Sequence, residues 1–218
     1  MNLLEAAKHV TYRAPVLNRL MSPKYPYKVS PGQLAVLVEL MNQTRSIGGS
    51  VMEIGVAHGS SSVFMLEHLR SVGDYRRIFL FDTFDGFTEE SVEVEVSQRG
   101  KVPANYSIFR YGDEQRFRKR LRSLGYQHFE TVKGDASKFD WRSIAPIAVV
   151  HLDIDLYQPT RAILNDIWPL LVDGGGIVID DCLPDNPYDG SLQAYEEFLA
   201  EHNLEFERAG SKGGVVRK

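Results

Sequence analysis

Short apolar runs recur along the chain from Ser50 onward, and longer stretches of mixed polarity separate them. The runs are apolar almost throughout instead of alternating, which is typical of strands covered on both faces of a parallel sheet. The stretches between them have helical periodicity or a helix-compatible length. Repeated strand and helix units predict a doubly wound, Rossmann-like α/β fold with right-handed crossovers. The predicted strands are residues 51–55, 78–82, 129–133, 147–153 and 176–180, and the predicted helices between them are residues 61–71, 114–124, 137–144 and 160–171.

The N-terminal part of the chain carries a helix-start signal ahead of this pattern. Ser30 followed by Pro31 predicts a helix over residues 31–44, because the hydroxyl can cap the first turn and proline suits the first helical position. Apolar positions nearer the start also have helical spacing. We therefore interpret residues 1–48 as a helical preface to a core of residues 49–218.

The C-terminal segment breaks the alternation of strands and helices. Residues 192–202 are predicted to be helical, and residues 204–208 and 214–217 are predicted to be two strands joined by a Gly-containing turn. We expect an antiparallel hairpin added to the edge of the parallel sheet.

Residues 84–112 are too many for an ordinary connection between a strand and a helix. Long insertions in compact domains are often lids or substrate loops, so a lid is one hypothesis for this segment. The alternative is a solvated excursion with a small strand, because Val92, Val94 and Val96 alternate with glutamates. With this insertion included, residues 1–218 have the length of one domain.

The charge balance argues against general nucleic-acid binding. The 218 residues contain 25 Lys and Arg against 29 Asp and Glu, a formal charge of −4, so no surplus positive field is available for a phosphate backbone. The single cysteine, Cys182, can form neither an intramolecular disulfide nor a thiolate zinc site, which indicates a reducing compartment, by default the cytoplasm. No stretch has the pattern of a signal peptide or a membrane span.

A glycine-containing turn follows the first predicted strand. Glu53, Gly55, Gly59 and Ser60 form an E-x-G-x-x-x-G-S sequence that opens a helix, and glycines there let the backbone turn tightly and approach a ligand. Asp82 ends the next strand, where a carboxylate can accept hydrogen bonds from both hydroxyls of a ribose. The pair of motifs predicts a cofactor that carries adenosine.

The residues that the turn lacks narrow the identity of this cofactor. A dinucleotide fingerprint would need glycines where the chain has Ala57 and Ser60, and no phosphate-binding loop follows the strand. S-adenosylmethionine has a ribose and an adenine but no phosphate, and its ammonium group can be met by an acidic or carbonyl site near Glu53. Asp135 and Ala136, after the third strand, are expected at the adenine amino group. A nicotinamide-dependent oxidoreductase is the alternative enzyme class.

Four aspartates follow the fourth and fifth predicted strands: Asp153, Asp155, Asp180 and Asp181. Ligands bind beyond the carboxyl ends of the strands in a doubly wound sheet, so these acids should converge on the cofactor. Clustered acids without a compensating Lys or Arg are costly unless a cation is bound, and oxygen ligands favour Mg²⁺, with Mn²⁺ or Ca²⁺ as alternatives. The other interpretation is that Asp155 or Asp181 caps the following element. We expect His151, inside the apolar strand, to be a core histidine.

These motifs resemble the TylF/MycF/NovP-type O-methyltransferases, which are class I S-adenosylmethionine enzymes that methylate sugar hydroxyls in antibiotic biosynthesis. The resemblance covers about residues 50–218 and rests on residues 53–59, 81–87, 152–157 and 174–181. It implies that Asp153, Asp180 and Asp181 bind Mg²⁺ and that Asp153 is a candidate base. Gln158 and Pro159 stand where the family often has Glu and Ser, and the preface is short. Both departures bear on which acceptor substrate the chain uses, and not on the fold.

The reaction implied is attack of an acceptor hydroxyl on the sulfonium methyl group, with Mg²⁺ orienting two neighbouring hydroxyls and Asp153 or Asp155 taking the proton. The expected acceptor is a sugar or another small hydroxylated metabolite, and the N-terminal helices would suit a homodimer. Two alternatives stay open: a metal-independent methyltransferase of the same fold, and a cofactor-binding module without catalysis.

Overall fold

The computed structural model of the chain describes residues 4–5, 10–11, 24–110 and 112–218. Most of the apolar positions near the start that have helical spacing, including Leu3 and Ala7, lie outside the described residues. Leu4 belongs to the described part, and its side chain is exposed. Within this part, no helix combines the length and the apolar character that crossing a membrane would require.

In the described part of the chain, seven strands form one sheet in the order β3-β2-β1-β4-β5-β7-β6. Strands β1 to β5 pair in parallel, and β7 pairs antiparallel with both β5 and β6. The doubly wound sheet and the antiparallel hairpin predicted from the sequence are confirmed. The strands are β1 (Ser50–Ile54), β2 (Ile78–Asp82), β3 (Phe129–Lys133), β4 (Ile147–Leu152), β5 (Leu171–Ile179), β6 (Glu207–Ala209) and β7 (Gly213–Arg217).

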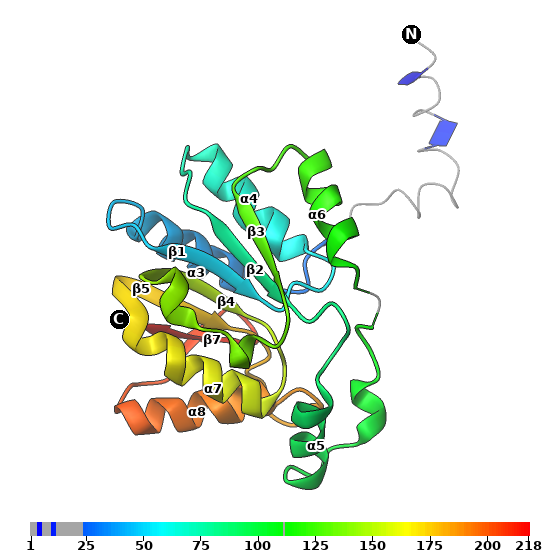
Figure 1. The fold of residues 1–218 in the computed structure, drawn as a ribbon, viewed down its shortest axis with the longest axis vertical. Coiled ribbons are helices and arrows are strands. Elements are labelled where there is room, and N and C mark those ends of the chain that lie inside the picture. Colours follow the sequence, from blue (N-terminus) through cyan, green and yellow to red (C-terminus); the bar gives the residue numbers. More distant parts are fainter. Residues whose placement is uncertain (1–3, 6–9, 12–23, 111) are drawn as a thin grey trace.

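Helices cover both faces of this sheet (Figure 1). One buried cluster joins the sheet to α3 (Pro31–Gln43), α4 (Ser60–Ser71) and α6 (Glu114–Ser123). A second cluster joins the opposite face to α7 (Tyr157–Ile167) and α8 (Gly190–His202). The side chains of β1 and β4 and the residues 175–179 of β5 are almost all buried, as their continuous apolar character predicts, whereas residues 172–174 at the start of β5 are not.

The predicted start of the helix at residue 31 is confirmed by a capping box. The Ser30 hydroxyl accepts a hydrogen bond from the Gln33 backbone N–H at 3.4 Å, and the Gln33 side chain accepts one from the Ser30 N–H at 3.0 Å. Two backbone donors at the helix start are satisfied in this way.

The small strand considered for residues 92–96 is wrong, because the segment forms α5 (Glu89–Ser97). The Thr88 hydroxyl caps the helix by accepting from the Ser91 N–H at 3.3 Å. One position of the helix, Glu95, is fully buried against the main body, whereas Glu93 is exposed. Tertiary contact at one helical position outweighs the local alternation of valine and glutamate.

The predicted helix over residues 137–144 is also wrong. Two short 3₁₀ turns take its place, η2 (Ala136–Lys138) and η3 (Trp141–Ile144), and Phe139 between them has an extended backbone. Asp135 and Asp140 each cap one turn, so the second aspartate starts a new turn instead of continuing a helix. Two further 3₁₀ turns among the described residues are η1 (Pro103–Tyr106) and η4 (Trp168–Leu170).

Candidate active site

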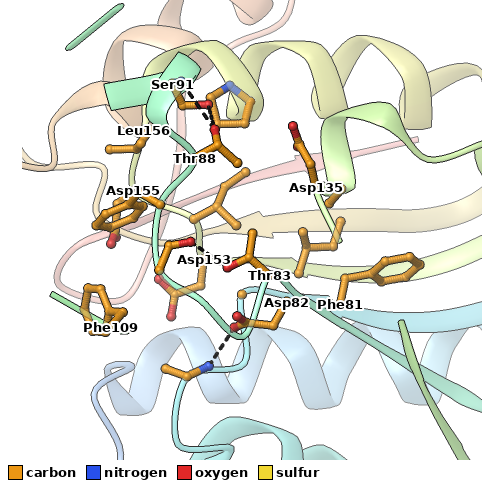
Figure 2. Close-up of a pocket in the computed structure, with 18 of the residues that line it drawn as sticks. Phe81, Asp82, Thr83, Thr88, Ser91, Phe109, Asp135, Asp153, Asp155 and Leu156 are labelled. Carbon is orange, nitrogen blue, oxygen red and sulfur yellow. Dashed lines mark hydrogen bonds between the residues drawn. The ribbon is translucent and has the colours of Figure 1, made fainter. Parts of the chain in front are cut away.

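A cavity of about 540 Å³ lies beyond the carboxyl ends of the parallel strands. Its walls come from the ends of β1, β2, β4 and β5, from the loop after β3, and from the insertion of residues 84–112. Figure 2 shows the side chains of Asp82, Asp135, Asp153 and Asp155 around this space. The position is the one that ligands occupy in doubly wound folds.

The turn after β1 requires glycine at position 55. Gly55 has φ +89°, and a Cβ atom there would overlap the backbone carbonyl of Asp153. Gly59 also has a left-handed backbone, and it is the N-cap of α4, which Ser60 begins. Gly55 and Ala57 line the cavity, whereas Gly59 and Ser60 are not among its lining residues. Gly59 and Ser60 therefore shape the turn, whereas Gly55 and Ala57 face the cavity.

Asp82 ties this turn to the end of β2. Its carboxylate accepts hydrogen bonds from the backbone N–H groups of Val56 at 2.9 Å and Ala57 at 3.1 Å, and from Phe84 at 2.7 Å. The residue also lines the cavity (Figure 2). A carboxylate has about four acceptor positions, so capacity for a ligand hydroxyl is left.

Asp135 lies on another wall of the same cavity, at the start of η2. Its carboxylate accepts from the Ser137 N–H at 3.0 Å and from the Ser137 hydroxyl at 2.7 Å. Asp135, Ala136 and Ser137 all line the cavity. Asp135 and Ala136 were predicted from the sequence, whereas Ser137 was not, because its hydrogen bonds to Asp135 depend on the turn geometry.

Glu53 has a different position from the one expected. Its side chain is fully buried and is not among the lining residues of the cavity. The carboxylate accepts a hydrogen bond from Ser62 and lies 3.0 Å from Nδ1 of His151. These two contacts hold the Glu53 carboxylate inside the core, so the geometry does not support direct contact between Glu53 and a cofactor. His151 is also fully buried, as expected of a core histidine.

Three of the four predicted acids gather at one point of the cavity. Asp153, Asp155 and Asp181 each offer a carboxylate oxygen, and these oxygens lie within 4.8 Å of one another. The backbone contributes to this convergence, because Asp155 and Asp181 have positive φ angles of 65° and 51°. We call these three residues the acid triad. Its oxygen donors fit a hard divalent cation such as Mg²⁺.

Asp180 does not belong to this triad, although the sequence resemblance grouped it with Asp153 and Asp181. One of its carboxylate oxygens accepts from Nε2 of Gln33 at 2.6 Å, and the other accepts from Nζ of Lys212 at 2.6 Å. The residue is nearly fully buried yet still borders the cavity.

The four aspartates were expected to lack a compensating Lys or Arg. This expectation is wrong, because the Lys212 side chain lies beside Asp180 and Asp181. Its ammonium also donates to the Asp181 carboxylate at 2.9 Å. Although burial alone lowers a lysine pKa, the neighbouring Asp180 and Asp181 raise the pKa of Lys212 above its usual range. Lys212 lies in the turn of the C-terminal hairpin, so only the tertiary fold brings it to the acids.

The pKa values of Asp153 and Asp155 are both raised well above the usual aspartate value. Burial is the main cause for each residue, and repulsion from neighbouring acids adds to it, chiefly from Asp180 for Asp153 and from Asp181 for Asp155. A carboxyl group whose pKa lies closer to neutrality is a better general base than an ordinary surface carboxylate.

Aromatic side chains from two segments line one part of the cavity. Phe84, Phe87 and Phe109 come from the insertion, and Tyr188 comes from the segment between β5 and α8. Phe87 contacts Phe109 edge-on with ring centroids 5.6 Å apart, and its ring lies 6.4 Å from that of Tyr188. A lid was expected in the insertion, and residues 81–87 entered the family resemblance, but Phe109 and Tyr188 were not predicted from the sequence.

Residues 52–182 match the family model described as a methyltransferase domain. A 4'-O-methyltransferase of Streptomyces olivaceus, named for 8-demethyl-8-(2,3-dimethoxy-alpha-L-rhamnosyl)-tetracenomycin-C, is 30% identical in an alignment of 151 residues that covers 62% of this chain and 53% of that protein. Demethyldecarbamoylnovobiocin O-methyltransferase of Streptomyces niveus is 26% identical over 156 residues, covering 69% and 59% of the two chains. The chain thus spans little more than half the length of these relatives.

Solved structures share the fold. The O-methyltransferase NovP superposes with a TM-score of 0.70 at 18% identity, covering 89% of this chain and 83% of NovP. The calicheamicin methyltransferase CalS11 gives 0.67 at 21% identity, covering 97% and 85%. The matched family model shows that the chain belongs to the methyltransferase-domain family, and these solved structures share the fold that the sequence resemblance implied.

Proposed function

We propose that this chain transfers a methyl group from S-adenosylmethionine to a hydroxyl of a sugar or of another small hydroxylated metabolite. The observation that carries the proposal is one cavity that joins an adenosine-type site to three converging aspartates. Asp82 and Asp135 lie toward one side of it, and Asp155 lies toward the other (Figure 2). The names of the relatives include a rhamnosyl tetracenomycin and demethyldecarbamoylnovobiocin, and the rhamnosyl group supports a sugar-linked acceptor.

The cofactor would lie across the ends of β1, β2 and β3. Asp82 offers its remaining acceptor position to a ribose hydroxyl, and Asp135 lies where the adenine amino group could donate. Nicotinamide dinucleotide is the weaker alternative, because Ala57 and Ser60 stand where its fingerprint needs glycine for close approach to the pyrophosphate.

The chemistry is an in-line displacement. S-adenosylmethionine supplies an activated methyl group, whose bond to sulfur breaks while the acceptor oxygen forms the new bond. Asp153 or Asp155 takes the proton of the acceptor hydroxyl, because both side chains line the cavity that would hold the acceptor. Phe87, Phe109 and Tyr188 limit the freedom of the acceptor, and most of the acceleration comes from holding it at near-attack distance.

We further propose that the enzyme uses Mg²⁺ held by the acid triad of Asp153, Asp155 and Asp181. A bound Mg²⁺ supplies positive charge that lowers the pKa of a neighbouring hydroxyl. The donor oxygens lie close enough together for shared coordination, which supports this ligand set over one that contains Asp180.

The test is transfer of an isotopically labelled methyl group to a panel of rhamnosides and related sugars, with the product position determined by NMR spectroscopy. We expect label on a sugar oxygen, and we expect Asp153→Asn with Asp155→Asn to lower the turnover rate about 10²–10⁴-fold. Label on nitrogen or carbon, or an unchanged rate in the double variant, would contradict the proposal.

A further inference from the structure

Lys212 is delivered to the acid cluster by the C-terminal hairpin. Strand β7 runs antiparallel to β5, so the turn that precedes β7 lies at the carboxyl end of β5, next to Asp180 and Asp181. The Cys182 N–H donates to the Lys212 carbonyl oxygen at 2.7 Å and fixes the turn there. The ammonium then reaches Asp180 at 2.6 Å and Asp181 at 2.9 Å, and the lysine side chain is 21% exposed.

This ammonium shares Asp181 with the acid triad. A divalent cation bound to the triad would therefore lie close to a second positive charge on the same carboxylate. Two like charges at such a distance repel appreciably even at an effective dielectric constant of about 20. Asp180 is 2% exposed, and each of its oxygens already accepts a hydrogen bond, one from Gln33 and one from Lys212, so two of its about four acceptor positions are taken.

We propose that Lys212 is an internal competitor of the divalent cation: its ammonium occupies Asp180 and Asp181 and weakens cation binding at the acid triad. This inference rests on the proposed Mg²⁺ site. When no cation is bound, Lys212 offsets part of the charge of four neighbouring aspartates and keeps them together. Cation binding then has to displace the ammonium from Asp181, which lowers the affinity of the triad compared with a site without the lysine.

The competing interpretation gives Lys212 a purely structural role. In that case the ammonium holds Asp181 in the orientation that a cation needs, and its removal would weaken cation binding. The two interpretations predict opposite signs for the same substitution.

The experiment is titration of Mn²⁺, a paramagnetic substitute for Mg²⁺, into the full chain, followed by EPR spectroscopy. Lys212→Met removes the charge and keeps an unbranched side chain of similar length. Lys28→Met is the matched control, because Lys28 also lines the cavity but is not hydrogen-bonded to Asp180 or Asp181. We expect Lys212→Met to bind Mn²⁺ about tenfold tighter or more, and Lys28→Met to stay within about twofold of the unchanged chain.

An unchanged or weaker Mn²⁺ affinity in Lys212→Met would overturn the inference. If that variant does not fold, as judged by circular dichroism, Lys212→Gln and Lys212→Arg give the same comparison: the glutamine variant should bind Mn²⁺ more tightly and the arginine variant should not. Absence of Mn²⁺ binding in every variant would overturn both this inference and the proposed Mg²⁺ site. Equal binding in all of them would overturn the role of Lys212 alone. Parallel titration with S-adenosylhomocysteine tests the cofactor proposal separately.

Discussion

Replacing Glu95 with alanine should destabilise the protein far more than a substitution on the surface of the same helix. Glu95 is fully buried, and its Oε1 accepts a hydrogen bond from the Tyr157 N–H at 2.6 Å, at the first residue of α7. The N-cap residue of that helix, Leu156, provides no side-chain cap, so the insertion supplies one from a distant part of the chain. The other carboxylate oxygen forms an ion pair with Arg99.

The size of the effect follows from these two contacts. Loss of a helix N-cap costs about 0.5–2 kcal/mol, and removal of one partner of a buried ion pair costs about 3–5 kcal/mol. Arg99 keeps a second partner, Asp189, at 2.7 Å, which limits the penalty for its charge. We therefore expect Glu95→Ala to lower the free energy of unfolding by about 3 kcal/mol.

Urea denaturation followed by circular dichroism measures this difference. Glu93→Ala is the control, because Glu93 is exposed on the same helix and should change the free energy of unfolding by less than about 0.5 kcal/mol. Equal effects of the two substitutions would refute the account of how the insertion is anchored. Because Tyr157 follows closely after Asp155 in the chain, Glu95→Ala should also weaken Mn²⁺ binding while the affinity for S-adenosylhomocysteine changes little.

Two further predictions concern the turn after β1 and the loss of folding stability at acidic pH. Gly55→Ala should abolish binding of S-adenosylhomocysteine, because the added Cβ meets backbone, whereas Gly100→Ala, also at positive φ but with open space around it, should not; equal calorimetric titrations would contradict this. Although burial raises the pKa of Asp74, hydrogen bonds and charge from Arg76 lower it below 3.8 overall. The pair therefore contributes stability that is present above pH 3.8 and lost as pH falls through the folded-state pKa. Asp74→Asn should make the free energy of unfolding fall less steeply with decreasing pH in the acidic range. An unchanged slope would contradict a stabilising role for the Asp74–Arg76 pair.

The parts of the fold that depend on local patterns were predictable from the sequence. Continuous apolar runs identify buried strands, and Ser30 with Pro31 marks a helix start because capping involves neighbours in the chain. Asp82 and Asp135 were predictable at the cavity because the ends of parallel strands meet at one edge of the sheet.

The contacts that were missed join distant segments. Lys212 reaches Asp180 only because the hairpin folds back along β5, and Gln33 reaches the same carboxylate from the N-terminal helix. Alternating valine and glutamate suggested a strand around Glu95, but burial of that glutamate against α7 favours a helix. No local pattern carries such information, because these charges are partnered only after the layers assemble.

Calorimetric titration with S-adenosylhomocysteine and, separately, with NAD⁺ tests the central claim most directly. The account predicts that the unchanged chain binds S-adenosylhomocysteine and not NAD⁺, and that Asp82→Ala loses most of this affinity while Mn²⁺ binding stays nearly intact. Binding of NAD⁺ without binding of S-adenosylhomocysteine would contradict the proposed methyl transfer.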